Sequence, residues 1–270
     1  MVKFAENSPE LYEIFIKYVS SATESLPEIT NTRELESFIL RLGELFRTLN
    51  APGGRDISGL WSELFIIFIS ENPDNALRLW YIDPYNTFAF SSSGMRLEVK
   101  STVRGVRTHE FSLEQLVPHI NDTGFVASVL LKNTALGSGV FDLAARIEEQ
   151  IKDNPHLKQK LWQNVIKALG IDFSEKLDKH FDIEFAKKDL ILYLMDDIPK
   201  PASPNDDRIT GLRFNSNLTD PTPKSCSIQK QNSGMINTPL SGGCADEKVT
   251  IYRRTDCLCP ETGRAGYIGT

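Results

Sequence analysis

The N-terminal part of the chain alternates apolar and polar residues with the period of an α-helix. This pattern predicts helices over residues 9–21 and 32–49 and a third, more apolar helix over 57–70. The run Pro52-Gly53-Gly54 separates the second helix from the third, because proline and glycine interrupt helices. We therefore expect a helical N-terminal region, residues 1–50, ahead of the main core.

Beyond residue 75 the pattern changes to short apolar runs that are typical of strands. The turn Ser93-Gly94 predicts a tight hairpin between two of them. The alternation of strands and helices favours an α/β fold, a restriction-endonuclease-like mixed sheet flanked by helices, with its core over 57–200. We expect strands over 76–82, 87–92, 95–102, 126–132, 180–185 and 190–195, and helices over 140–152 and 156–169.

The composition of the chain changes near Pro199. The segment from there onward contains 7 of the 14 prolines, 7 of the 17 glycines and all four cysteines, and it lacks hydrophobic periodicity. We therefore expect one domain over residues 1–219 and an irregular, cysteine-containing tail over 220–270. One residue separates Cys257 from Cys259, whereas structural zinc sites favour two residues between the cysteines of a pair. This spacing indicates free thiols rather than zinc.

Charge and hydropathy narrow the possible classes of protein. The chain has 36 acidic and 30 basic residues, a formal charge of −6, which excludes a uniformly basic protein but leaves room for a local basic patch. The longest apolar run, residues 64–69, is much shorter than the roughly 20 residues that span a bilayer. No signal-peptide pattern is visible, and the absence of cysteine before Cys226 favours a reducing compartment. We expect a cytoplasmic protein without a membrane partner.

The strand predicted over 95–102 contains the candidate chemistry. Residues two apart share one face of a strand, so Glu98 and Lys100 point to one side while Leu97 and Val99 point into the core. A carboxylate can hold Mg²⁺, and an ammonium group can stabilise charge on a phosphate, as metal-dependent phosphodiester cleavage requires. An isolated Glu-x-Lys pair is most often a solvated strand face, so its surroundings must decide.

Neighbouring residues in the sequence strengthen this candidate. Glu63 lies on the apolar helix over 57–70, where a carboxylate needs a cationic or metal partner unless it reaches water. Between residues 96 and 109 four basic residues stand against one acid, Glu98, which suits a phosphate backbone, although an ordinary mixed surface has the same composition. The candidate DNA contacts are Arg96, Arg104, Arg107 and His109.

Several segments together resemble the PD-(D/E)XK nuclease superfamily. More narrowly they resemble the bacterial "PD-(D/E)XK motif protein" family, whose members tend to occur with restriction and phage-defence genes. The resemblance covers about residues 10–218. It rests on Gly59-Leu60-x-x-Glu63-Leu64, Phe88-Ala89-Phe90, the strand from Arg96 to Thr102, and His109-Glu110-Phe111-Ser112-Leu113-Glu114-Gln115-Leu116.

This resemblance implies a Mg²⁺- or Mn²⁺-dependent nuclease that acts on DNA, with other restriction or defence proteins as partners. By the same resemblance, Glu98 would be the metal-binding acid and Lys100 the lysine of the motif. Glu63 would be a second acid that assists the metal, and Gln115 would be a polar residue of the site.

Position 89 departs from the family pattern, which has an aspartate where this chain has Ala89. If Ser93-Gly94 is a two-residue turn, the residue numbers of two positions that face each other across the hairpin add up to 187. Position 89 therefore faces Glu98. Alanine binds no metal, so Mg²⁺ binding should be weak. Asp83 is a candidate substitute, but it lies roughly 20 Å away along an extended strand, and a turn residue is its more ordinary role.

Three functions are compatible with these residues. The first is an endonuclease-like protein of a restriction or defence system, impaired by Ala89 through either an inactivating substitution or natural loss of catalysis. The alternative is a catalytically inactive DNA-binding or assembly subunit of such a system. The third is a structural α/β protein in which the Glu-x-Lys pair is incidental.

Overall fold

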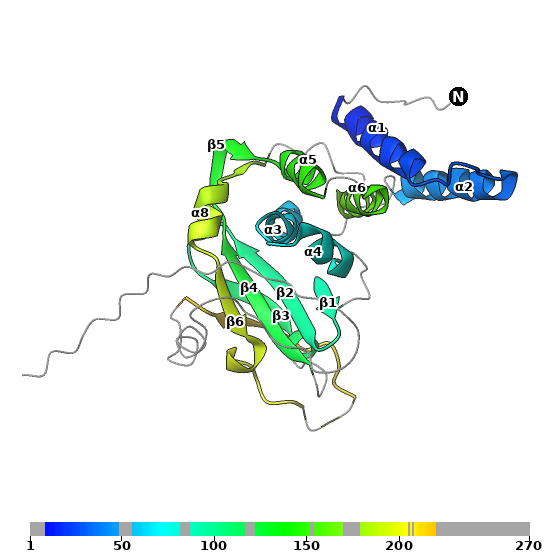
Figure 1. The fold of residues 1–270 in the computed structure, drawn as a ribbon. Coiled ribbons are helices and arrows are strands. Elements are labelled where there is room, and N and C mark those ends of the chain that lie inside the picture. The colour runs from blue at the N-terminus through cyan, green and yellow to red at the C-terminus, as the bar shows by residue number, and fades with distance from the viewer. Residues whose placement is uncertain are drawn as a thin grey trace, which may run out of the picture.

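A mixed four-stranded sheet lies at the centre of the computed structural model (Figure 1). Its order is β1 (Phe90–Ser92), β2 (Met95–Thr102), β4 (Thr123–Leu130) and β6 (Ile191–Leu194). β2 and β4 run parallel, whereas β1 and β6 pair antiparallel with their neighbours. The structure describes residues 9–48, 56–81, 87–116, 122–151, 154–169, 179–204, 206 and 208–219.

Helices cover one face of this sheet (Figure 1). α3 (Ile57–Phe68) packs directly on β2, with α4 (Pro73–Leu79), α5 (Val140–Gln150) and α6 (Pro155–Leu169) around it. α3 is buried on nearly all sides because its sequence is apolar nearly all round, and its Trp61 and Leu64 are fully enclosed. Leu97 and Val99 of β2 join the same core.

A smaller layer lies on the opposite face of the sheet. β3 (Thr108–Ser112) pairs antiparallel with β7 (Arg213–Asn217). The short 3₁₀ turn η1 (Leu113–Leu116) contacts β3, and η2 (Met195–Asp197) contacts β4. A second hydrophobic core, which includes Phe111, Tyr193 and Met195, fills this side. Because residues alternate along β2, its polar side chains Glu98 and Lys100 face this smaller layer.

The N-terminal helices pack at the outer edge of the helical layer. α1 (Pro9–Glu24) and α2 (Thr32–Thr48) both contact α6 (Figure 1). α2 begins at a reciprocal cap. Asn31 Oδ1 accepts a 3.0 Å hydrogen bond from the backbone N–H of Glu34, and Glu34 Oε2 accepts one of the same length from the backbone N–H of Asn31. The predicted helical N-terminal region is therefore present.

The fold class predicted from the sequence is confirmed. All five expected helices are present, as α1, α2, α3, α5 and α6, and three expected strands correspond to β2, β4 and β6. The hairpin at Ser93-Gly94 is also present, since Gly94 has a positive φ of 84° that a tight turn of this kind uses. Of the strand expected over 87–92, only β1 forms.

Two predicted strands are wrong, and both are replaced by capped helices. Residues 73–79 form α4, because Asn72 accepts the Asn75 amide over 2.9 Å and proline follows at the first helical position. Similarly, Asp182 accepts the Phe185 amide over 3.0 Å and begins α8 (Ile183–Lys188). The strand β5 (Asn133–Ser138) was not expected from the sequence.

The predicted tail over 220–270, with its four cysteines, lies outside the described residues, as does Asp83. No helix in the described part of the chain combines the length and hydropathy needed to cross a membrane.

Candidate functional site

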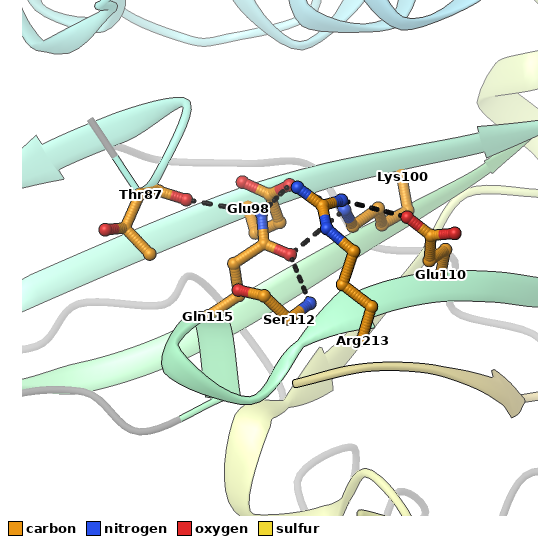
Figure 2. A network of polar contacts seen from close by, with 7 residues as sticks. All are labelled: Thr87, Glu98, Lys100, Glu110, Ser112, Gln115 and Arg213. Carbon is orange, nitrogen blue, oxygen red and sulfur yellow. Dashed lines mark hydrogen bonds and ion pairs between the residues drawn. The ribbon is translucent and has the colours of Figure 1, made fainter. Parts of the chain in front are cut away.

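Glu98 and Lys100 form an ion pair on the face of β2 that is turned away from the helices (Figure 2). Lys100 Nζ lies 3.0 Å from Glu98 Oε1. The Lys100 ammonium also lies 5.3 Å from the ring centre of Phe111, within range of a cation–π contact. Residue Glu98 is only 8% exposed, so the carboxylate is held in one place rather than solvated.

Gln115 joins this pair from η1 and closes a three-residue cluster (Figure 2). Its Nε2 donates to Glu98 Oε1 over 3.1 Å and to the carbonyl oxygen of Thr87 over 3.4 Å. Its Oε1 accepts from Lys100 Nζ over 3.3 Å and from the Ser112 amide over 3.1 Å. The amide therefore fixes both the carboxylate and the ammonium group. We call Glu98, Lys100 and Gln115 the polar cluster.

Ala89 lies immediately before β1, beside the polar cluster's strand. The pairs Phe90–Leu97, Ser91–Arg96 and Ser92–Met95 have the predicted register, and one more step along it would bring Ala89 opposite Glu98. The residue is 4% exposed and belongs to the larger core. Its backbone is ordered too, because its carbonyl accepts the Tyr81 N–H over 3.0 Å. The methyl group thus occupies an enclosed position.

Glu63 lies on α3, on the helical side of the sheet. Its Oε2 accepts a 2.7 Å hydrogen bond from the indole nitrogen of Trp80, and the residue is 7% exposed. Glu98 points from β2 toward the opposite layer. The two acids that the resemblance assigns to the metal therefore come from opposite sides of the sheet.

Two of the four expected DNA contacts, Arg107 and His109, are buried. Arg107 is 5% exposed and its guanidinium donates to the Ser128 carbonyl over 2.7 Å, to Ser128 Oγ over 3.0 Å and to the carbonyl of Asp189. His109 is 4% exposed and lies 2.8 Å from the same hydroxyl. The alternation of β3 continues back to Arg107 and turns both side chains inward, and their shared partner Ser128 lies on another strand, β4.

Burial also changes the acid–base behaviour of this pair. The pKa of His109 falls from 6.5 to about 4, chiefly because burial disfavours the imidazolium and then because Lys100 and Arg107 are positive. Burial likewise lowers the pKa of Arg107. His109 is therefore neutral at physiological pH and acts as a structural hydrogen-bonding group.

The other two expected DNA contacts remain nearer the surface. Arg104 is exposed in the loop between β2 and β3. Arg96 is partly exposed, but it pairs with Asp122 over 2.9 Å and donates to the carbonyls of Ser92 and Met95. Arg104 is thus the more available cation of the two.

Sequence reasoning missed a charged pair beside the polar cluster. Arg213 of β7 is the register partner of Ser112, whose amide bonds Gln115, and its guanidinium lies 2.9 Å from Glu110 Oε1 (Figure 2). Both residues are exposed. The signal was weak because β7 is about a hundred residues beyond β3 in the chain. Arg213 is therefore an exposed cation beside the polar cluster, with Glu110 as its partner.

A comparison with known protein families matches residues 2–219 to the family described as "Putative PD-(D/E)XK family member, (DUF4420)". The chain belongs to this family. The match spans all of the described residues and supports a nuclease-like fold. No curated protein and no solved structure matches the chain.

Nucleases of the PD-(D/E)XK superfamily generally use Mg²⁺ or Mn²⁺. The residues that this family member presents do not fit such an ion well. Within the described part of the chain, no three histidine, cysteine or acidic side chains come together. Glu98 is the carboxylate of the polar cluster, and its charge is already balanced by Lys100 at 3.0 Å. Mg²⁺ surrenders its water only to strong anionic ligands, so the polar cluster as it stands is a poor set of ligands for this ion.

Proposed function

We propose that the chain is a DNA endonuclease-like protein of a restriction or defence system whose Mg²⁺-dependent phosphodiester hydrolysis is impaired by Ala89. The observation that supports this is the polar cluster, in which Glu98, Lys100 and Gln115 come from two separate elements to one point. In a solvated Glu-x-Lys pair both charged groups would bond mainly to water, whereas here a partly buried glutamine bonds both of them. Within the described residues, Glu98 is the one carboxylate of the polar cluster.

Each residue of the polar cluster has a distinct task in this proposal. Lys100 would stabilise negative charge on a phosphate oxygen, since its ammonium is preorganised and only partly exposed. Glu98 would be an anionic anchor for a divalent ion once a second acid completes the site, and such an ion supplies an activated water when it is bound. Gln115 would hold the carboxylate and the ammonium group in position, so that neither side chain must move when DNA binds.

A catalytically inactive DNA-binding or assembly subunit is the second candidate. Its specific support is the ion pair itself, because a carboxylate neutralised by Lys100 repels a phosphate backbone less than a free one. Arg104, in the loop between β2 and β3, and Arg213 of β7 are exposed cations, and Arg213 is paired with Glu110. This candidate predicts DNA binding that weakens with salt and needs no metal.

Plasmid cleavage in Mg²⁺ and in Mn²⁺ tests the first candidate. We compare the chain with Ala89→Asp, with Ala89→Asn as the uncharged control of equal size, and with Ala89→Asp/Lys100→Ala. Cleavage by Ala89→Asp alone would support the endonuclease-like proposal. Cleavage by the unchanged chain would mean that another acid, with Asp83 first, completes the site. Absence of cleavage throughout, with salt-sensitive DNA binding retained, would favour the binding subunit.

Thermal stability separates a failed fold from a failed site. Because Ala89 is buried, Ala89→Asp should lower the free energy of unfolding by about 2 kcal/mol or more without metal. If the introduced carboxylate and Glu98 share a cation, Mn²⁺ should restore much of that loss by binding only the folded state. Ala89→Asn should show no such recovery. Equal responses of the two variants to Mn²⁺ would contradict a metal site at this position.

A further inference from the structure

An open cavity lies between the N-terminal helices and α6, away from the polar cluster. It has a volume of about 560 Å³ and is lined by the connection between α1 and α2, by the first part of α2 and by α6. α3 and α4 lie between α6 and the sheet (Figure 1), so the cavity and the polar cluster belong to different faces of the molecule. Its size is in the range that small-molecule sites occupy, about 300–1,000 Å³.

The cavity is lined mainly by positive and neutral polar side chains. Arg33, Arg41 and Lys160 contribute three positive charges. Glu34 is the one acid among the described lining residues, and its Oε2 is engaged in the cap of α2, where it accepts the Asn31 amide over 3.0 Å. The cavity therefore has a formal charge of about +2 before His156, which also lines it, is counted.

The three cations have no anionic partner among the described residues. Lys160 Nζ donates to the carbonyl of Arg78 over 2.6 Å and lies 5.0 Å from the ring centre of Tyr81, and both of these partners are uncharged groups. None of the ion pairs of the described chain includes Arg33 or Arg41. A cluster of like charges that is left unbalanced is costly for the fold.

Two further features of these cations are unfavourable for the fold. Arg33 lies in the first turn of α2, where the helix dipole disfavours a cation. The pKa of Lys160 falls to about 8, mainly because of burial and then because Arg78 is positive. An anion in the cavity would relieve both effects at once.

We propose that this cavity binds a phosphate-bearing ligand of about nucleotide size. The two guanidinium groups and the ammonium group that line the cavity can each bind phosphate oxygens, and arginine binds phosphate through paired N–H groups. Gln159 and Gln163, which also line the cavity, supply neutral donors and acceptors for the remainder of the ligand. The proposal goes beyond nuclease function, because it concerns a different face and different residues.

Calorimetric titration of the full chain tests this site with two probes, ATP and the oligonucleotide d(T)8. The test variant is Arg33→Gln/Arg41→Gln, which removes two exposed cations without touching the core. The matched control is Arg47→Gln, which removes one exposed cation from the same helix outside the cavity. A third variant, Lys100→Ala, reports on the polar cluster. We expect the double variant to weaken binding about tenfold or more and Arg47→Gln to change it little.

The probes and variants give separate outcomes. Weakened binding of ATP in the double variant, with Lys100→Ala unaffected, supports a mononucleotide-type ligand. The same pattern seen only with d(T)8 supports a phosphodiester strand as the source of the phosphate. The proposal is overturned if neither probe binds the unchanged chain, or if Arg33→Gln/Arg41→Gln binds both as tightly as Arg47→Gln does. A loss confined to Lys100→Ala would leave the proposed nuclease site standing and remove this one.

The pH dependence of binding is an independent readout. Affinity for ATP should fall from about pH 7 to about pH 9, because Lys160 loses its proton and its positive charge over this range. The charge of the phosphate stays constant there, since the second pKa of a phosphomonoester is about 6. Lys160→Met should bind more weakly and lose this dependence. An unchanged pH profile in Lys160→Met would remove Lys160 from the site. The charged and titratable groups around Lys160 are Arg33, Glu34, Arg41, Arg78, Tyr81 and His156.

Discussion

Single buried side chains decide much of the chemistry on the smaller side of the sheet. Arg107 and His109 both meet Ser128 of β4, so one hydroxyl and one carbonyl tie the start of β3 to the central sheet. A buried guanidinium is tolerated here because backbone carbonyls accept its hydrogen bonds. The imidazole is tolerated only in its neutral form, which makes this contact sensitive to acid.

We expect His109 to reduce stability as the pH falls. The pKa of His109 is about 4 in the folded chain and 6.5 as its ordinary value, so below pH 6.5 the unfolded chain takes up a proton that the folded chain refuses. The free energy of unfolding should therefore drop by up to about 3 kcal/mol between pH 6.5 and pH 4 on this account. His109→Gln, which can still bond Ser128, should lose that contribution when urea unfolding is compared at the two pH values. Parallel acid slopes for both proteins would contradict the assignment.

At the scale of elements, close backbone approaches fix where strands and helices meet. Gly137 of β5 lies against the backbone of Phe181, and a Cβ added at Gly137 would lie 2.5 Å from the Phe181 carbonyl oxygen. Backbone atoms cannot move aside as a flexible side chain does. Phe181 in turn packs at a tilt against Trp61 of α3, so this contact links β5 to the centre of the helical layer.

We expect Gly137→Ala to destabilise the chain by about 1–3 kcal/mol, since the backbone around Phe181 must shift. The matched control is Gly43→Ala in α2, where an added Cβ meets nothing and alanine favours the helix by up to about 1 kcal/mol. Chemical unfolding of both variants measures the difference. Equal stability of the two would show that the approach at Phe181 relaxes freely.

The whole molecule has two hydrophobic cores, one on each face of a single sheet. The larger core joins α3, α5, α6 and the inner face of β2, and the smaller one joins β3, β6 and β7. The family match ends at residue 219, directly after β7. All described members of both cores thus lie within the matched segment.

A chain shortened to residues 1–219 should keep the fold. Because both cores lie within this segment, we expect the free energy of unfolding to change by less than about 0.5 kcal/mol, as for changes outside packed regions. Thermal and urea unfolding followed by circular dichroism would measure it. A clear loss of stability would show that residues 220–270 pack on the body, and it would overturn the domain boundary predicted from composition.

The sequence alone was sufficient where local rules act without competition. The Ser93-Gly94 turn and the alternation along β2 determined the hairpin register and placed Glu98 and Lys100 on one face, as observed. Sequence signals also conflicted: Ala76 and Leu77 look like a strand by composition, yet the cap at Asn72 makes them helical. Cap geometry outweighed apolar pattern there because it satisfies backbone donors.

Only the tertiary structure decided which of the candidate residues meet. Gln115 joins Glu98 and Lys100 because η1 folds back over β2, whereas Glu63 is held on the helical side by Trp80. Burial of Arg107 depends on partners in β4 and beyond α8 that lie 21 and 82 residues away in the chain, so no local pattern could reveal it. Strand alternation fixes a side chain's face, but what that face packs against depends on contacts between distant segments.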